Sequence, residues 1–172
     1  MAMTTTLALA VVRVMVGLLV AGHGAQKVAG AFGGPGMRTW TGHVAALGIA
    51  PAPLFAWCAA VAELIGGLAL ALGFFTPVAA ALVTTVMLVA IAKAHWKKGP
   101  WAAKGGYELP LMFAVAAAAA GLADEATYSL DAVIGLAPTP ALFVTTLAIA
   151  IVTVLAGFAI AAPLRVRQRQ SA

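Results

Sequence analysis

RVMVGLLVAGHGAQKVAG, residues 13–30, is the stretch that decides the fold. It lies in an apolar segment long enough to cross a bilayer, yet it carries four polar side chains: Arg13, His23, Gln26 and Lys27. An ionisable group inside a spanning helix costs about 2.5–3.5 kcal/mol on insertion scales, so such groups usually face a partner, a cavity or a ligand. The rest of the chain has to show what these side chains meet.

Composition places the whole chain in a membrane. Of its 172 residues, 63% are hydrophobic and only 9% are charged, whereas soluble domains carry about 25% charged residues. The mean hydropathy is +1.04. The net charge of +5 comes from basic residues scattered through short loops and a tail, which does not indicate nucleic-acid binding. A single cysteine, Cys58, excludes an internal disulfide, and Arg13 interrupts what would be the core of a signal peptide.

Five apolar stretches reach the about 17–25 residues that a spanning helix needs. We expect spans at 6–28, 54–75, 78–96, 107–123 and 141–162. Gly33–Gly36 breaks the helix after the first span, and residues 37–48 are predicted to form an amphipathic interfacial segment. The sequence therefore predicts an all-α, polytopic transmembrane helix bundle. Residues 1–135 would form a four-helix domain, and residues 136–172 an additional transmembrane helix with a basic cytoplasmic tail.

The distribution of lysine and arginine predicts the orientation. Nearly all of them lie in the loops 27–53 and 97–106 and in the C-terminal tail, whereas the loop 124–140 carries three acids and no base. Because positive charges remain in the cytoplasm, we expect the N-terminus outside and the C-terminus inside. The Ala- and Gly-rich composition is compatible with a bacterial plasma membrane.

Two groups of polar side chains are expected within the bundle. From the helical rise, Arg13 and Glu63 lie about 21 Å and 15 Å above the inner boundary, so we expect them to pair near the middle of the membrane. That pair could be purely structural or could tune a site. His23, Lys27, His95 and Glu108 are expected to gather near the inner face, where interfacial anchoring is the alternative explanation for the lysines and for His95.

Four motifs in order resemble the DoxX family of membrane proteins. They are Arg13-xxx-Gly17 with His23-Gly24-xx-Lys27-xx-Gly30, Ala62-Glu63-Leu64-Ile65-Gly66-Gly67, His95-Trp96-x-Lys98-Gly99 and Gly105-Gly106-Tyr107-Glu108-Leu109-Pro110. Members of that family are four-helix membrane units, so the fifth span would be an extension. The resemblance implies a redox role linked to membrane quinone, since family members are associated with quinone-dependent sulfur oxidation and with soluble thiol- or superoxide-handling enzymes.

The sequence thus favours a subunit of a quinone-linked redox system. His23, Lys27 and His95 would donate to a quinone headgroup, Arg13 and Glu63 would polarise a deeper part of the site, and His23 and Glu108 would carry protons. No metal site is expected. The chain has no dinucleotide, flavin or haem-attachment motif, so electrons would come from a soluble or membrane redox partner on the cytoplasmic side. Alternatives are a scaffold for a soluble redox enzyme, a small-molecule transporter, and haem held by His23 and His95.

Overall fold

The computed structural model describes residues 3–123 and 127–170, with side chains through residue 161. Within these residues the chain forms helices joined by turns and contains no strand, which confirms the predicted all-α bundle. The helices are α1 (Met3–Ala29), α2 (Gly36–Ala46), α3 (Ala52–Leu72), α4 (Thr76–Ala90), α5 (Glu108–Leu122), α6 (Leu130–Val133) and α7 (Ala141–Gln170).

Four of these helical segments are long and apolar enough to cross a membrane: Met3–Ala29, Ala52–Leu72, Thr76–Lys98 and Ala141–Ala161. The third continues α4 through a π-helical turn at Ile91–His95 and a final 3-10 turn. The predicted fourth span is α5, which has 15 residues and is therefore about 22 Å long, shorter than a bilayer core. The segment predicted at 37–48 is the helix α2.

Glycine ends α3 and directs the chain into α4. Gly73 adopts the left-handed conformation (φ 68°), and the Phe74 N–H donates to the Ala69 carbonyl at 2.8 Å, which satisfies a carbonyl of the last turn. Pro77 lies in the first turn of α4, where its missing N–H costs nothing. This short return makes α3 and α4 antiparallel neighbours.

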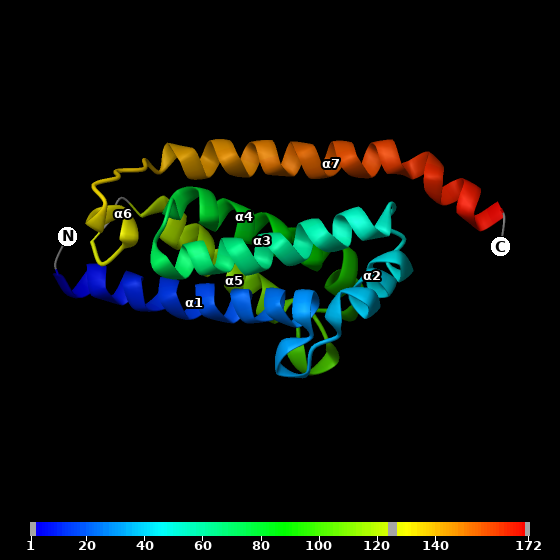
Figure 1. Ribbon diagram of the computed structural model, residues 1–172, viewed down its shortest axis with the longest axis horizontal. Helices are drawn as coiled ribbons and strands as arrows, with labels where there is room; N and C mark the ends of the chain where they lie inside the picture. The colour runs from blue at the N-terminus through cyan, green and yellow to red at the C-terminus, as the bar shows by residue number, and fades with distance from the viewer. Residues whose placement is uncertain (1–2, 124–126, 171–172) are drawn as a thin grey trace.

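The helices α1, α3, α4 and α5 form the bundle, and its core is made of small and branched side chains (Figure 1). Val20, Leu70 and Val83 are fully buried there. The helices α1 and α3 approach most closely, because glycines face the opposite backbone. A Cβ added to Gly17 or Gly67 would come within 3.0 Å of main-chain atoms across the interface, and one added to Gly24 would do the same against Leu64.

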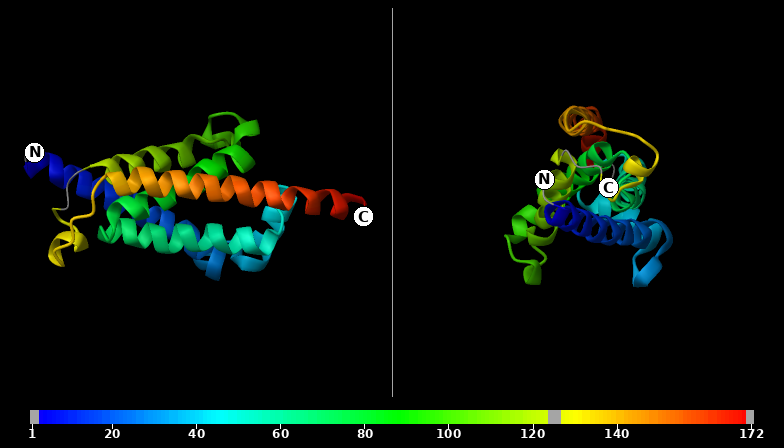
Figure 2. Two further views of the ribbon diagram at one scale, coloured as in Figure 1. Left: turned by 90° about the horizontal axis from the view of Figure 1, so that it is seen from above. Right: turned by 90° about the vertical axis from the view of Figure 1, so that its left-hand side faces the viewer.

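Helix α7 lies along the outside of the bundle, against α4 (Figure 1, Figure 2). In the apolar part of α7 only 6% of the residues are buried, compared with 50% in the segment Thr76–Lys98. Its anchors are Phe143, which packs near Gly121, and Phe158, whose ring centroid lies 5.1 Å from that of Phe55. A helix this exposed and this apolar is suited to face lipid.

Candidate functional site

Polar side chains gather in two places along α1. The Lys27 layer comprises His23, Gln26, Lys27, Trp40 and Glu63, where α1 meets α2 and α3. The Arg13 layer comprises Arg13, Thr76, Tyr128 and Asp131, at the end of the bundle that holds the turn between α3 and α4. Each layer is described in turn.

The Lys27 layer is centred on an ion pair. Glu63 of α3 is 3% exposed, and one of its carboxylate oxygens accepts from the ammonium group of Lys27 on α1, whose side chain is 16% exposed. A carboxylate buried so completely among apolar helices needs a counter-charge, and Lys27 supplies it. The pair thus places a carboxylate and an ammonium group in direct contact inside the bundle.

Helix α2 covers the ion pair. The Lys27 ammonium lies 4.4 Å from the centroid of the Trp40 ring, which is a cation–π distance. The Trp40 indole N–H donates to the Ala56 carbonyl of α3 at 3.2 Å, which fixes the ring in place. The short amphipathic helix therefore holds an aromatic ring over the charged pair.

His23 lies one helical turn before Lys27 on α1. Its Nδ1 is 3.2 Å from Gln26 Oε1, and its ring centroid is 6.1 Å from that of Phe113 on α5. The side chain is half-buried. With Nδ1 directed at the amide oxygen, Nε2 is the ring nitrogen left to accept or donate a proton.

The Arg13 layer ties three segments together. Asp131 on α6 is 1% exposed, and its carboxylate accepts from the Phe75 and Thr76 N–H groups at 2.8 and 3.1 Å and from the Thr76 hydroxyl at 3.2 Å. It thus caps the start of α4 from a distant part of the chain. Arg13 donates to the Tyr128 carbonyl at 2.7 Å and is close enough to Asp131 for electrostatic attraction.

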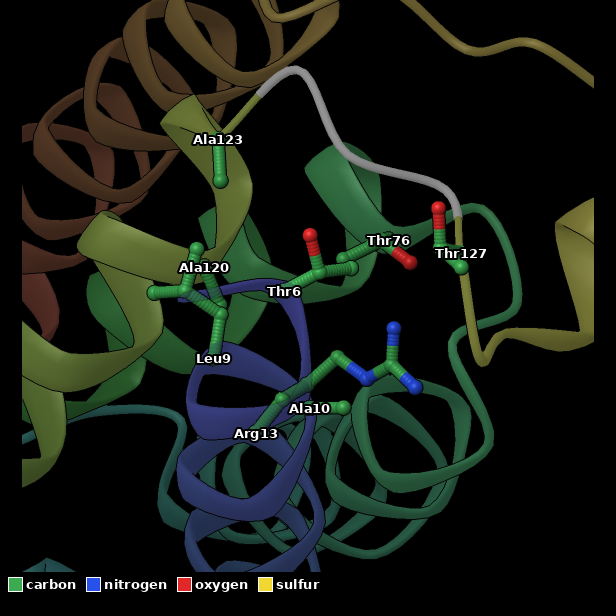
Figure 3. A pocket seen from close by; sticks show the side chains of 8 residues that line it. All are labelled: Thr6, Leu9, Ala10, Arg13, Thr76, Ala120, Ala123 and Thr127. Atoms are coloured by element: carbon green, nitrogen blue, oxygen red, sulfur yellow. The ribbon is translucent and has the colours of Figure 1, made fainter. Parts of the chain in front are cut away.

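A small cavity adjoins Arg13 (Figure 3). The Arg13 side chain extends from α1 toward Thr76 and Thr127, and Thr6 completes the polar wall. The cavity volume is about 10 Å³, which suits a single water molecule. Among the described residues, Arg13 Nε is buried without a hydrogen-bond partner.

A family model matches the part of the chain that holds the whole Lys27 layer and, from the Arg13 layer, Arg13 and Thr76. The DoxX model matches residues 8–96. The chain belongs to the DoxX family. The DoxX match runs from α1 through the π-helical turn and so includes Arg13, His23, Lys27, Glu63 and His95. Neither the curated proteins nor the solved structures contain a match to the chain.

The predicted pairing of Arg13 with Glu63 is wrong. In this DoxX protein Glu63 pairs with Lys27, and the Arg13 side chain lies beside Gly73, where an added Cβ would be 2.6 Å from one guanidinium nitrogen. Gly73 is ten residues from Glu63 along the chain, a rise of about 15 Å if helical. The prediction measured depth from the ends of the predicted spans, whereas the glycine contacts set the actual register between α1 and α3.

The predicted inner cluster of His23, Lys27, His95 and Glu108 does not form one site, because His95 and Glu108 make their contacts elsewhere. His95 Nδ1 donates to the Gly105 carbonyl at 2.7 Å, and Glu108 accepts from the Ala102 N–H at 2.8 Å. Both partners are main-chain groups of the loop that precedes α5. In the part of the chain that the structure describes, no hydrogen bond or ion pair joins either residue to His23 or Lys27. The same residues contain no group of three or more His, Cys, Asp or Glu able to hold a metal ion.

Asp131 and Trp40 are the residues that sequence reasoning missed in these roles. Asp131 lies in a loop predicted on the same side of the membrane as the N-terminus, and that loop holds three acids and no base. The available signal is that Arg13 lies in the outer half of the first span, on the same side as these acids. Trp40 was placed at the interface, and its position over Lys27 has no signature in the sequence.

Proposed function

We propose that this DoxX protein is the membrane subunit of a quinone-linked redox system and that the Lys27 layer binds the quinone headgroup. The observation that carries the proposal is the Lys27–Glu63 ion pair, with the half-buried His23 one helical turn before Lys27 on α1, all within apolar helices. A quinone ring is apolar, its two carbonyls accept hydrogen bonds, and its reduction takes up two electrons and two protons. The electrons would come from a redox protein that binds on the same side as this layer.

The donor set fits such a headgroup. The ammonium of Lys27 has three N–H donors, and Glu63 engages one of them. Nε2 of His23 is a second donor when the ring is protonated. Trp40 would keep water from the pair and leave its electrostatic effect strong. Lys27 would orient the headgroup, Glu63 would hold the Lys27 ammonium group in position, and His23 would hold or release a proton at Nε2.

The test is the quinone content of the purified protein. We expect quinone to remain with the wild-type chain after extraction in mild detergent, and to be recovered by solvent extraction and measured by absorbance. Removing a charge-assisted hydrogen bond costs about 1.5–3 kcal/mol, so His23→Ala and Glu63→Gln should each weaken quinone binding about 10- to 100-fold. Lys93→Gln is the matched control, because Lys93 lies over Phe158 of α7, outside the layer.

Three outcomes would contradict the proposal. Unchanged quinone binding in both folded variants would show that the headgroup lies elsewhere. A wild-type protein that neither retains nor rebinds quinone would exclude the quinone-linked function. A Soret band in the purified protein would replace quinone with haem as the redox group.

A further inference from the structure

The loop that joins the end of α4 to α5 carries three exposed lysines and two exposed tryptophans within a short stretch of chain. We name residues 96–107 the Trp96 loop. Lys97, Lys98 and Lys104 are exposed, and Trp96 and Trp101 are 64% and 63% exposed. The proposed quinone site uses none of these five side chains. The two exposed tryptophans and three exposed lysines of this loop therefore need a functional explanation separate from the quinone site.

The Trp96 loop is held in one shape by its own hydrogen bonds. The Gly106 N–H donates to the Trp101 carbonyl at 3.0 Å, and the Tyr107 N–H donates to the Gly99 carbonyl at 3.1 Å. Gly106 is buried, and a Cβ there would lie closer than 3.0 Å to Gly99 and Pro100. Glu108 fastens the loop by accepting from the Ala102 N–H. These contacts fix the backbone of the loop, so the loop holds its lysines in defined positions.

Aromatic stacking and a lysine side chain complete this frame. The ring centroids of Trp96 and Tyr107 are 5.4 Å apart with the planes inclined by 18°, so the two rings stack. The side chain of Lys98 lies over Gly105, where an added Cβ would be 3.6 Å from its ammonium nitrogen. A positive charge is thus kept at the turn of the loop beside an aromatic pair.

The position of the Trp96 loop brings it to the membrane surface. It starts in the last turn of the apolar segment Thr76–Lys98 and ends at the residue before α5. Figure 2 shows it projecting sideways from the bundle, near residue 100 on the colour bar. Tryptophan favours the level of the headgroups, and lysine near that level attracts anionic lipid.

We propose that the Trp96 loop is a binding site for the headgroup of an anionic phospholipid. Lys97, Lys98 and Lys104 attract the lipid phosphate, while Trp96 and Trp101 insert between headgroups and acyl chains. A lipid is favoured over an acidic soluble protein because the two exposed tryptophans lie where a membrane would bury them. Each lysine near an anionic surface contributes roughly five-fold in affinity, so the three together give about 100-fold preference for anionic over zwitterionic lipid.

The first experiment measures lipid retention by native mass spectrometry of the full chain released from nanodiscs of phosphatidylcholine and phosphatidylglycerol. We expect phosphatidylglycerol to be retained preferentially. The triple variant K97Q/K98Q/K104Q should lose that preference by about 100-fold, and Lys93→Gln, which removes a lysine outside the loop, should keep it. Equal retention of the two lipids by the wild type would overturn the proposal, as would an unchanged preference in the triple variant.

A second pair of variants separates a built site from diffuse attraction. Glu108→Ala removes a negative charge, so diffuse attraction predicts tighter binding of phosphatidylglycerol. A built site predicts weaker binding, because the Ala102 N–H loses its acceptor and the loop loosens. Gly106→Ala changes no charge and should also weaken binding. Helical circular dichroism and the thermal midpoint confirm that each variant is folded, and unchanged or tighter binding by folded Glu108→Ala overturns the built site.

Two further results assign the ligand. Millimolar inorganic phosphate should not displace phosphatidylglycerol, and displacement would show that the loop binds free phosphate and not a lipid. If the triple variant retained phosphatidylglycerol normally but no longer bound an acidic soluble protein, the loop would be a protein-docking surface and the lipid assignment would be wrong. Quinone content does not enter these measurements, so they remain decisive whether or not the proposed quinone site is correct.

Discussion

The two polar layers solve the problem of buried charge in different ways. In the Arg13 layer the charges are held by main-chain groups, since Asp131 accepts from two backbone N–H groups and Arg13 donates to a backbone carbonyl. In the Lys27 layer Lys27 and Glu63 pair side chain to side chain, under the ring of Trp40. The first arrangement depends on the fold, and the second depends on two side chains.

This difference indicates which layer can do chemistry. A carboxylate that caps a helix and serves several donors cannot give up those hydrogen bonds without leaving the N–H groups at the start of α4 unpaired. A side-chain pair can exchange a partner or a proton while the helices stay in place. We therefore propose a structural role for the Arg13 layer and keep the proposed function with the Lys27 layer.

The largest effect is expected for Asp131→Ala. The change leaves the Phe75 and Thr76 N–H groups without their acceptor and removes the negative charge near Arg13, so it should lower the free energy of unfolding by about 4 kcal/mol. Titration with sodium dodecyl sulfate in mixed micelles measures this change in the free energy of unfolding. Asp131→Asn keeps an acceptor and should cost about half as much. A cost for Asp131→Ala below that of Glu63→Ala would reverse the assignment of the two layers.

Glu63→Ala should cost less, about 3 kcal/mol, because the long side chain of Lys27 can turn its charge toward water. A sharper test is whether removing both charges of the pair restores the free energy of unfolding. The double variant K27M/E63L removes both charges and should return to within about 1 kcal/mol of the wild type. The corresponding R13M/D131L should not recover, because the N–H groups at the start of α4 still lack an acceptor. Equal recovery in the two double variants would show that the layers do not differ.

Trp40→Phe should have the smallest effect. It removes the bond to the Ala56 carbonyl and weakens the contact with Lys27, for a loss of about 1 kcal/mol in unfolding free energy. Trp57→Phe is the matched control, because Trp57 is an exposed residue of α3, and it should change the unfolding free energy very little. If both variants behaved alike, Trp40 would not be a cover of the Lys27 layer.

The helices were predictable from the sequence, whereas their register was not. Long apolar runs bounded by Gly30, Gly73 and Pro77 place α1, α3 and α4 within a few residues, because the bilayer demands such lengths. The offset of α1 along α3 depends on how Gly17 and Gly24 meet the opposite backbone. That offset decides whether Arg13 or Lys27 reaches Glu63. It cannot be inferred from composition or from the lengths of the spans.

The candidate site was predictable in part for the same reason. His23, Lys27 and Glu63 stand out in the sequence because charged and ionisable groups are rare in apolar helices. Asp131 belongs to a polar loop where an acid is unremarkable, so its burial follows only from the fold. His95 and Glu108 have the right chemistry for a site, but their nearest partners are main-chain groups of the Trp96 loop.

The close approach of α1 and α3 determines how the Lys27 layer can move. With backbone against backbone at Gly17, Gly24 and Gly67, the two helices have no side chains there to slide or rotate past one another, so they behave as one rigid body. Any opening that admits a ligand to the ion pair must come from a displacement of α2 and its ring. The eleven residues of α2 are therefore the element whose displacement would uncover the ion pair while α1 and α3 stay together.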